Sequence, residues 1–317
     1  MTDINAIDTI AVIGTGTIGA SWTALFLGAG KVVRAWDPAP GAEARLRQAV
    51  TQAWPSLTTL GGHGGETADV ALRRLTFHAD PAEAADGADF VQENVPERIE
   101  IKRDTYAKLE STLRDDVIIS SSTSGIMPSE LQAEMRHPER LVVGHPFNPP
   151  HLVPLVEIVP GKATSEQVAT DAVAFYRAIG KTPVRLHKEV IGHIANRLQG
   201  AVLRETLYLA LEGVASVKDI DLAMSMGPGQ RWAFMGQAKL FGLAGGQGAM
   251  AHFLDHLGPA VEDWWADLGA PHLTPEARRI LTEAYPAMDA ETFGAAIDWR
   301  DQALLRRLKA LSEDPAQ

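Results

Sequence analysis

The sequence predicts an α/β protein in which a doubly wound, mostly parallel sheet comes first and an all-α domain follows. Residues 1–188 alternate short apolar, β-rich runs with helical stretches, which is typical of a parallel sheet covered on both faces. From residue 189 onward the apolar positions recur at three and four residues, with almost no strand composition. At 317 residues the chain is long enough for two domains. We therefore expect a sheet domain at 1–188 and a helical domain at 189–317.

The N-terminal segment predicts a βαβ unit. Ile10–Ile13 is a short apolar strand, Trp22–Ala29 has helical composition and ends before Gly30, and "KVVRAWD" is a second buried strand. Strand, turn, helix and strand follow one another without interruption, as in the βαβ motif. Residues 41–54 then predict a helix, and the glycine-rich segment "TTLGGHGGET" breaks it as an exposed loop.

The alternation continues through the rest of the first domain. The further strands are expected at Leu75–Phe77, Phe90–Val91, Val117–Ser120 and Leu141–Val143, and the further helices at Ile99–Leu113 and Ser129–Glu134. The helical domain begins with "IGHIANRLQGAVLRETLYLALEG".

Charge and hydropathy exclude several classes of partner. The formal net charge is −11 and the pI about 5.4, so the average surface repels nucleic acid and anionic membranes. No apolar run approaches the roughly 20 residues of a membrane-spanning helix, and the acidic start "MTDINAID" is unlike a signal peptide. The chain has no cysteine, which excludes disulfides and thiolate catalysis. We expect a cytoplasmic protein with a small-molecule partner, no nucleic-acid or membrane partner and no metal.

The segment "GTGTIG" supplies Gly14, Gly16 and Gly19 between the first strand and its helix. Gly14 permits a tight turn, Gly16 lets backbone N–H groups approach a pyrophosphate, and Gly19 allows close packing of helix on strand. Asp37 ends the second strand, where a carboxylate accepts ribose hydroxyls and repels a 2′-phosphate, which favours NAD over NADP. The pattern predicts a Rossmann-type dinucleotide site. The alternative is a tight turn followed by a solvated aspartate.

The segment "SSSTSG", residues 120–125, places hydroxyl groups at the end of another strand. Open α/β sheets bind ligands at the carboxyl ends of their strands, so these hydroxyls are candidates for ligand binding. The alternative is a capping cluster for the helix that "MPSELQ" begins.

In "VVGHPFNPPHLVPLVEIV", His145 follows an apolar strand and Glu157 lies within another apolar segment. A return of the chain at the intervening prolines would bring the imidazole and the carboxylate together. The carboxylate would then fix the histidine tautomer and stabilise the imidazolium, as general base catalysis requires. The alternative is a structural histidine in a loop. An unpaired carboxylate flanked by "LV" and "IV" is costly to bury, so Glu157 is expected to have a partner.

Asn196 lies near the expected domain junction, where substrates commonly bind. A hydrogen bond between helices is the alternative role for this side chain.

Together these segments resemble the short-chain 3-hydroxyacyl-CoA dehydrogenase family, in the same order and over nearly the whole chain. The similar segments are "VIGTGTIG", "VQENVPERIEIKRDTYAKL", "SSSTSG", "GHPFNPPHLVPLVEIVPG" and "IANRL". The resemblance implies that His145 is the general base, that Glu157 orients it, and that Ser124 and Asn196 hydrogen-bond the substrate oxygen and the nicotinamide. It also implies the following cofactor-binding residues: Gly14, Gly16, Thr17, Ile18, Gly19, Asp37, Glu97 and Lys102. For Glu97 and Lys102 the alternatives are an exposed carboxylate at a helix start and a solvated lysine.

One departure from the family bears on the substrate. Family members that act on acyl-CoA usually show "SNTSS" where this chain has "SSSTSG", and they carry a lysine-rich helical pair near residues 50–75. Here no lysine or arginine occurs between Arg47 and Arg73, so this segment lacks the cationic side chains that would bind the phosphates of coenzyme A. The second half resembles the branch with lambda-crystallin, L-gulonate 3-dehydrogenase and L-carnitine dehydrogenase. "RWAFMG" and "GAMAHFLDHLGPA" look most like L-carnitine dehydrogenase.

This resemblance implies NAD-dependent oxidation of a small L-3-hydroxy acid to the 3-oxo acid, with L-carnitine as the leading substrate. Two alternatives stay open: another 3-hydroxy acid such as L-gulonate or a 3-hydroxyacyl-CoA, and a non-catalytic, crystallin-like NAD-binding protein. Family members form homodimers, so we expect a homodimer through the helical domain.

A trimethylammonium group donates no hydrogen bonds, so aromatic faces are its natural partners. The candidate aromatic residues are Phe147, Trp232, Phe234, Phe241, Trp264 and Trp265, and Arg231 is the candidate partner of the substrate carboxylate. The alternative for each ring is packing between core helices.

Overall fold

The structure is a computed structural model that describes residues 4–61 and 64–312. The chain divides into two units, one comprising Met1–Asn196 with Trp299–Gln317 and the other Arg197–Asp298. The sequence places the boundary after residue 188; in the structure the first unit continues to Asn196, and the backbone N–H groups of Ile194 and Ala195 donate hydrogen bonds to Glu157 of its sheet. The first unit also takes in α-helical residues from Trp299 onward, which the sequence assigns to the second domain. Residues 62 and 63 of the expected glycine-rich loop lie outside the described residues.

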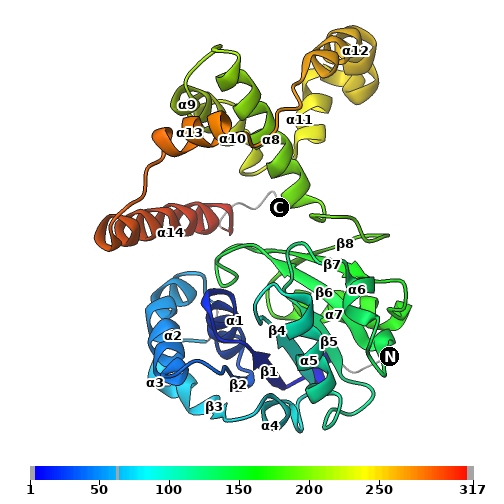
Figure 1. Ribbon diagram of the computed structural model, residues 1–317, viewed down its shortest axis with the longest axis vertical. Helices are drawn as coiled ribbons and strands as arrows, with labels where there is room; N and C mark the ends of the chain where they lie inside the picture. Colours follow the sequence, from blue (N-terminus) through cyan, green and yellow to red (C-terminus); the bar gives the residue numbers. More distant parts are fainter. Residues whose placement is uncertain (1–3, 62–63, 313–317) are drawn as a thin grey trace. The chain divides into compact units, whose positions relative to one another are not determined.

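An eight-stranded sheet forms the centre of the first unit, in the order β3-β2-β1-β4-β5-β6-β7-β8 (Figure 1). The strands are β1 Thr9–Ile13, β2 Val32–Trp36, β3 Leu75–His78, β4 Phe90–Glu93, β5 Ile118–Ser121, β6 Leu141–Pro146, β7 Leu155–Pro160 and β8 Thr182–Arg185. Every pair is parallel except β6 with β7. The structure confirms the doubly wound, mostly parallel sheet and each strand that the sequence predicts. It adds β8, and it shows that the apolar segment around Glu157 is a strand.

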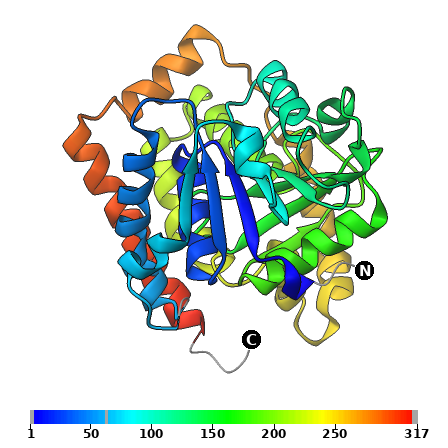
Figure 2. The ribbon, with the colours of Figure 1, turned by 90° about the horizontal axis from the view of Figure 1, so that it is seen from below.

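Helices cover both faces of this sheet (Figure 2). The α-helices of the first unit before residue 190 are α1 Thr17–Gly28, α2 Ala42–Thr59, α3 Ala68–Ala71, α4 Pro81–Ala85, α5 Ile99–Leu109, α6 Pro128–Gln132 and α7 Glu166–Ala178. On one face Trp22 stacks on Phe26 with ring centroids 5.4 Å apart, and Phe90 stacks on Phe175 at 4.1 Å. A second apolar cluster fills the opposite face, so the sheet is buried on both sides.

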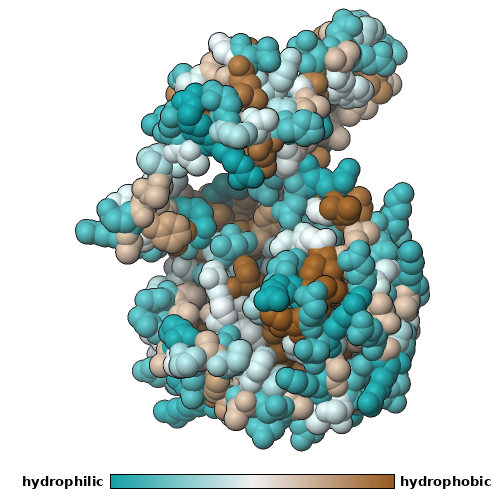
Figure 3. Space-filling model, viewed as in Figure 1, coloured by the Kyte–Doolittle hydropathy of each residue, from teal (hydrophilic) through white to brown (hydrophobic). Residues whose placement is uncertain are grey.

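The rest of the described chain is helical. Its helices are α8 Ala195–Leu211, α9 Val217–Met226, α10 Pro228–Trp232, α11 Gln237–Ala244, α12 Ala249–Asp267, α13 Pro275–Ala284 and α14 Ala290–Ser312. The all-α C-terminal part is therefore confirmed. On the face shown in Figure 3, apolar side chains (brown) lie among polar ones (teal) in both units. None of the helices within the described ranges is long and apolar enough to cross a bilayer.

Candidate active site

The turn between β1 and α1 requires glycine at two positions for steric reasons. Gly14 adopts a φ of +87°, and a Cβ there would lie 2.7 Å from the carbonyl oxygen of Asn94. A Cβ on Gly19 would lie 1.9 Å from the carbonyl oxygen of Gly14, so helix and turn approach too closely for any side chain. Both residues therefore build the turn itself.

Gly16 is different, because nothing lies within 4 Å of the position that its Cβ would take. Gly16 is also the N-cap of α1, so the first N–H groups of the helix, which include those of Thr17 and Ile18, have no partner within the helix. A helix N-terminus with room beside its first N–H groups is a cradle that fits a pyrophosphate group. These residues therefore fit NAD.

We expect Gly16→Ala to weaken NAD+ binding by at least about tenfold without lowering the unfolding midpoint, because the added methyl fills only the cradle. Isothermal titration calorimetry with NAD+ and a thermal melt of the unliganded protein measure the two quantities. Gly200→Ala is the matched control, since its Cβ also meets nothing within 4 Å but lies in α8. Unchanged NAD+ affinity in Gly16→Ala would show that the pyrophosphate binds elsewhere.

Asp37 is tied to the same turn. Its Oδ2 accepts a hydrogen bond from the backbone N–H of Thr15 at 2.7 Å, and its Oδ1 accepts one from Ala39 at 2.9 Å. The carboxylate is thus fixed beside the cradle and keeps lone pairs on both oxygens for ribose hydroxyls. It is not simply a solvated aspartate.

His145 and Glu157 form a buried pair. The antiparallel register of β6 and β7 places the two residues directly opposite each other, and such residues project from the same face of a sheet. His145 Nδ1 lies 2.9 Å from Glu157 Oε2, with the two side chains 6% and 1% exposed. Glu157 Oε1 accepts two more hydrogen bonds, from the N–H groups of Ile194 at 2.8 Å and Ala195 at 3.0 Å.

These contacts set the protonation of the pair. Burial alone would raise the pKa of Glu157, but the hydrogen bonds from His145 and from the two backbone N–H groups outweigh it and hold the pKa below its usual value. The ionised carboxylate only accepts hydrogen bonds, so His145 Nδ1 must carry the hydrogen. His145 Nε2 is then left with a lone pair, which is what a general base requires.

Two further rings flank His145. The Phe147 ring lies edge-on to it at a centroid distance of 5.4 Å, and the His193 ring lies at 5.0 Å. Phe147 therefore lies beside the candidate base, and its contact with the substrate stays a prediction. The sequence analysis did not single out His193, although it lies in the quoted "IGHIANRL" segment.

Ser124 and Asn196 are also brought together. The Asn196 side-chain N–H lies 3.5 Å from the Ser124 carbonyl oxygen. Within the described chain the Ser124 hydroxyl makes no hydrogen bond, so it is available to a ligand. Their roles toward substrate and nicotinamide stay predictions.

Glu97 anchors the Ser124 loop. Its Oε1 accepts hydrogen bonds from the Thr123 hydroxyl at 2.5 Å and from the N–H groups of Ser124 and Gly125 at 3.0 and 3.1 Å. Burial would raise the pKa of Glu97, but these bonds and the nearby Lys102 lower it below its usual value. Glu97 is therefore an anion held beside the candidate site by hydrogen bonds, although its side chain is 44% exposed and lies just before α5, as the alternative expects.

The other hydroxyls of the cluster serve the fold. Ser120 bonds Tyr176, Ser121 donates to Glu93 and Ser122 donates to Asn94. The expected capping role is found only in part. Thr123 accepts from the N–H of Ile126, but α6 itself has no side-chain cap.

Lys102 is buried, with 1% exposure, in an ion pair with Glu93 at 2.8 Å. Its ammonium lies 3.5 Å from Glu97, so it supports that anion from inside the protein. Glu93 also accepts hydrogen bonds from Tyr106, Ser121 and the N–H of Val95. Lys102 is thus not a solvated lysine, and its direct contact with the cofactor stays a prediction. The sequence analysis missed Glu93, although a carboxylate ending an apolar strand is the same signal that marked Glu157.

We expect Lys102→Met to lower the free energy of unfolding by about 3–5 kcal/mol, because it leaves the buried Glu93 carboxylate without its cation. Urea unfolding followed by circular dichroism measures this. Lys108→Met is the control, since Lys108 lies on the same helix and is exposed. A loss below about 1 kcal/mol, as is usual for exposed pairs, would contradict the interpretation.

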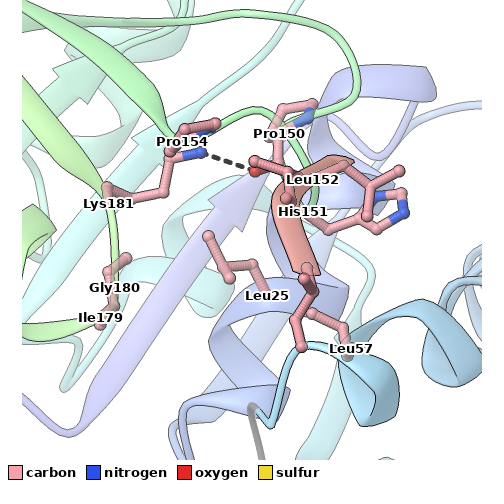
Figure 4. Close-up of a pocket in the computed structure, with 11 residues that line it drawn as sticks. Leu25, Leu57, Pro150, His151, Leu152, Pro154, Ile179, Gly180 and Lys181 are labelled. Atoms are coloured by element: carbon pink, nitrogen blue, oxygen red, sulfur yellow. Dashed lines mark hydrogen bonds between the residues drawn. The ribbon is translucent and has the colours of Figure 1, made fainter. Parts of the chain in front are cut away.

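The buried side chain of Lys181 holds the segment that joins β6 to β7 in place through hydrogen bonds. Lys181 donates to the carbonyl oxygens of Pro150, at 2.6 Å, and Val153, and lies 5.3 Å from the centroid of the Trp22 ring. It borders a cavity of about 270 Å³ (Figure 4). Burial lowers the pKa of Lys181 to about 7. Because a neutral amine still has two N–H groups, both bonds persist when the proton leaves.

The remaining candidates lie in the second unit. Arg231, Trp232 and Phe234 are exposed in and after α10, and Trp232 lines an apolar cavity of about 340 Å³. Phe241 stacks on Phe253 at 4.7 Å, which favours the packing alternative for that ring. Trp264 and Trp265 are 57% and 66% exposed. Contact of these residues with a substrate stays a prediction.

The chain matches two family models. Residues 9–190 match the model of the 3-hydroxyacyl-CoA dehydrogenase NAD binding domain, and residues 192–268 match that of the C-terminal domain. The L-carnitine dehydrogenase of Nocardiopsis dassonvillei is 46% identical over 309 residues, which cover 97% of this chain and 93% of that protein. The L-carnitine dehydrogenase of Pseudomonas aeruginosa is 43% identical and covers 100% and 98%.

A solved structure is also similar over nearly its full length. It is that of 5-formyl-3-hydroxy-2-methylpyridine 4-carboxylic acid 5-dehydrogenase, described as an NAD+-dependent dismutase. It is 32% identical with a TM-score of 0.86 and covers 97% of this chain and 99% of its own.

Proposed function

The chain belongs to the 3-hydroxyacyl-CoA dehydrogenase family, and from that premise we propose that it oxidises L-carnitine to 3-dehydrocarnitine with NAD+. The observation that carries the proposal is the buried His145–Glu157 pair at the carboxyl end of β6, in a chain 46% and 43% identical to two L-carnitine dehydrogenases. The turn at Gly14–Gly19 lies three strands away along the same sheet, about 14 Å at the usual strand spacing. A dinucleotide lying across the strand ends is expected to bridge that distance.

His145 takes the proton of the substrate hydroxyl. Its Nδ1–H donates to Glu157, so its Nε2 accepts the proton. The ionised Glu157 then stabilises the imidazolium, because a buried ion pair is poorly screened by water. When bound, NAD+ accepts the hydride that leaves C3. Ser124 and Asn196 are proposed to hold the substrate oxygen and the nicotinamide carboxamide.

The rest of the substrate consists of a trimethylammonium group and a carboxylate. Phe147, edge-on to His145, is proposed to contact the methyl groups. From the second unit we propose Trp232 and Phe234 as further aromatic partners and Arg231 as the partner of the carboxylate, on the chemistry of their side chains alone.

Formation of NADH, followed by absorbance at alkaline pH, tests the proposal with L-carnitine, D-carnitine, L-gulonate and 3-hydroxybutyryl-CoA. We expect turnover with L-carnitine and little with the other three. Turnover only with L-gulonate or only with the CoA ester would overturn the substrate. Absence of turnover with every 3-hydroxy acid would support a non-catalytic NAD-binding protein.

We also propose that the protein is a cytoplasmic homodimer. The second unit exposes large apolar side chains, which soluble proteins usually cover. They include Leu203, Trp232, Phe234, Leu254, Leu257, Trp264 and Trp265. Light scattering coupled to size-exclusion chromatography should give twice the chain mass of 34.1 kDa.

A further inference from the structure

A second histidine lies beside the catalytic pair. His193 is 1% exposed, and its ring centroid is 5.0 Å from that of His145. Its backbone has a φ of +52°, a left-handed conformation that is strained for a residue with a Cβ. The residues that follow it, Ile194 and Ala195, supply the two N–H groups bound to Glu157. His193 is therefore held firmly next to the base.

The partners of the ring define its protonation. His193 Nε2 lies 3.4 Å from the carbonyl oxygen of Thr123, which only accepts, so Nε2 carries the hydrogen. Nδ1 is buried and makes no hydrogen bond within the described residues. The ring thus presents a lone pair that has no donor. A lone pair carries partial negative charge, which attracts a nearby cation even when that cation donates no hydrogen bond.

The charged groups around His193 favour this neutral form. Burial is the largest cause and lowers its pKa, and His145 on β6 lowers it further. Glu157 on β7 and Glu97 after β4 act in the opposite direction but do not cancel the effect. The ring is therefore neutral at the alkaline pH of the dehydrogenase assay.

We propose that His193 is a specificity-determining residue, a neutral imidazole buried beside the base whose lone pair attracts the cationic end of the substrate. This inference rests on the proposed function. The quaternary nitrogen of carnitine is two bonds from the carbinol carbon, so it stays close to the imidazole that binds the hydroxyl. Any charge on a ring 5.0 Å from that imidazole acts on the cation over a short, poorly screened distance. A lone pair and an aromatic face attract the cation, whereas an imidazolium repels it.

The test compares L-carnitine with its uncharged carbon isostere, 3-hydroxy-5,5-dimethylhexanoate, which keeps the shape and removes the positive charge. The ratio of kcat/KM for the two substrates is measured in the wild type, His193→Asn and His193→Arg. Asparagine tolerates the left-handed backbone and stays neutral, and arginine is always charged. We expect His193→Arg to raise KM for L-carnitine by at least about tenfold and to leave the isostere nearly unchanged. An equal effect on both substrates would overturn the proposal.

A pH series keeps the test decisive if His193→Arg does not fold. Because the pKa of His193 lies below its usual value near 6.5, the wild-type preference for L-carnitine should stay constant above about pH 7 and fall below about pH 6, as His193 gains a proton. In His193→Asn the fall should be smaller by at least about threefold, because the asparagine side chain gains no proton. An equal fall in both proteins would overturn the proposal. His137→Asn, at a partly exposed histidine that pairs with Asp115 and Glu139, is the control and should behave as the wild type.

NAD+ affinity and melting temperature are measured for every variant, so that a loss of folding is recognised. Failure of the underlying function would be visible in the wild type alone, as an absence of NADH formation with L-carnitine. That result would remove the basis of this inference as well. Normal wild-type turnover with unaltered preference in the variants would reject His193 and leave the proposed function standing.

Discussion

Replacing His145 by alanine is expected to lower kcat for L-carnitine by about 10³-fold, within the range usual for loss of a general base. The imidazole is the only group in the described part of the site that is both buried and oriented by an ionised carboxylate with a lone pair free. NAD+ affinity should change little, because the cofactor cradle is built from Gly14–Gly19 and Asp37. Single-turnover absorbance measures the chemical step, and fluorescence titration with NADH measures binding.

His137→Ala serves as the control for removal of a partly exposed histidine outside the candidate site, and it should keep wild-type kcat. Near-normal turnover in His145→Ala would show that another group takes the proton. Loss of NADH binding with folding intact would show that His145 acts on the cofactor.

The second large effect is expected for Glu157→Gln, which should lower kcat by at least about 100-fold while the protein stays folded. The amide oxygen can still accept from the N–H groups of Ile194 and Ala195, so the segment before α8 keeps its anchor. The amide nitrogen, however, donates toward His145 Nδ1 and favours the tautomer with the hydrogen on Nε2. In that tautomer the base has no lone pair for the substrate hydroxyl.

A double variant tests whether Glu157 acts through His145 or contributes to catalysis independently. If Glu157 acts through His145, then His145→Ala with Glu157→Gln should be no slower than His145→Ala alone. Multiplication of the two single effects would instead assign Glu157 a contribution of its own. The kcat values of the wild type, both single variants and the double variant complete the cycle.

The residues of the pair could be predicted from the sequence, but their contact could not. A histidine after an apolar strand and a carboxylate inside an apolar run are local patterns. Their contact depends on the antiparallel register of β6 with β7, in a sheet whose other pairs are parallel. Register between strands is fixed by long-range packing, so a local pattern does not determine it.

Helix α2 is longer than the sequence predicts, because its last turn buries apolar surface. The sequence predicts its end at Trp54, ahead of the glycine-rich segment, and Pro55, a residue type that disfavours a helix interior, follows directly. The helix continues to Thr59, and its buried stripe of Leu46, Val50 and Trp54 extends to Leu57. The buried apolar surface of that last turn outweighs the hydrogen bond that proline cannot make.

The burial of His193 and Lys102 could not be predicted from the sequence, for a different reason. Neither position has an apolar or polar periodicity that reveals burial, because both are buried by their partners and not by the pattern of their own segment. The glycine turn was easier to predict, since its three glycines lie within six consecutive residues, although the backbone contact that requires Gly14 comes from Asn94 after β4.

A crystal structure of Glu157→Gln with NAD+ and L-carnitine bound would test the whole arrangement, because the slow variant preserves both ligands. We predict the carnitine hydroxyl oxygen within about 3 Å of His145 Nε2, the nicotinamide on the opposite side of C3 and the pyrophosphate on Gly16. Carnitine bound away from His145, or a pyrophosphate remote from the turn at Gly14–Gly19, would contradict the proposed mechanism.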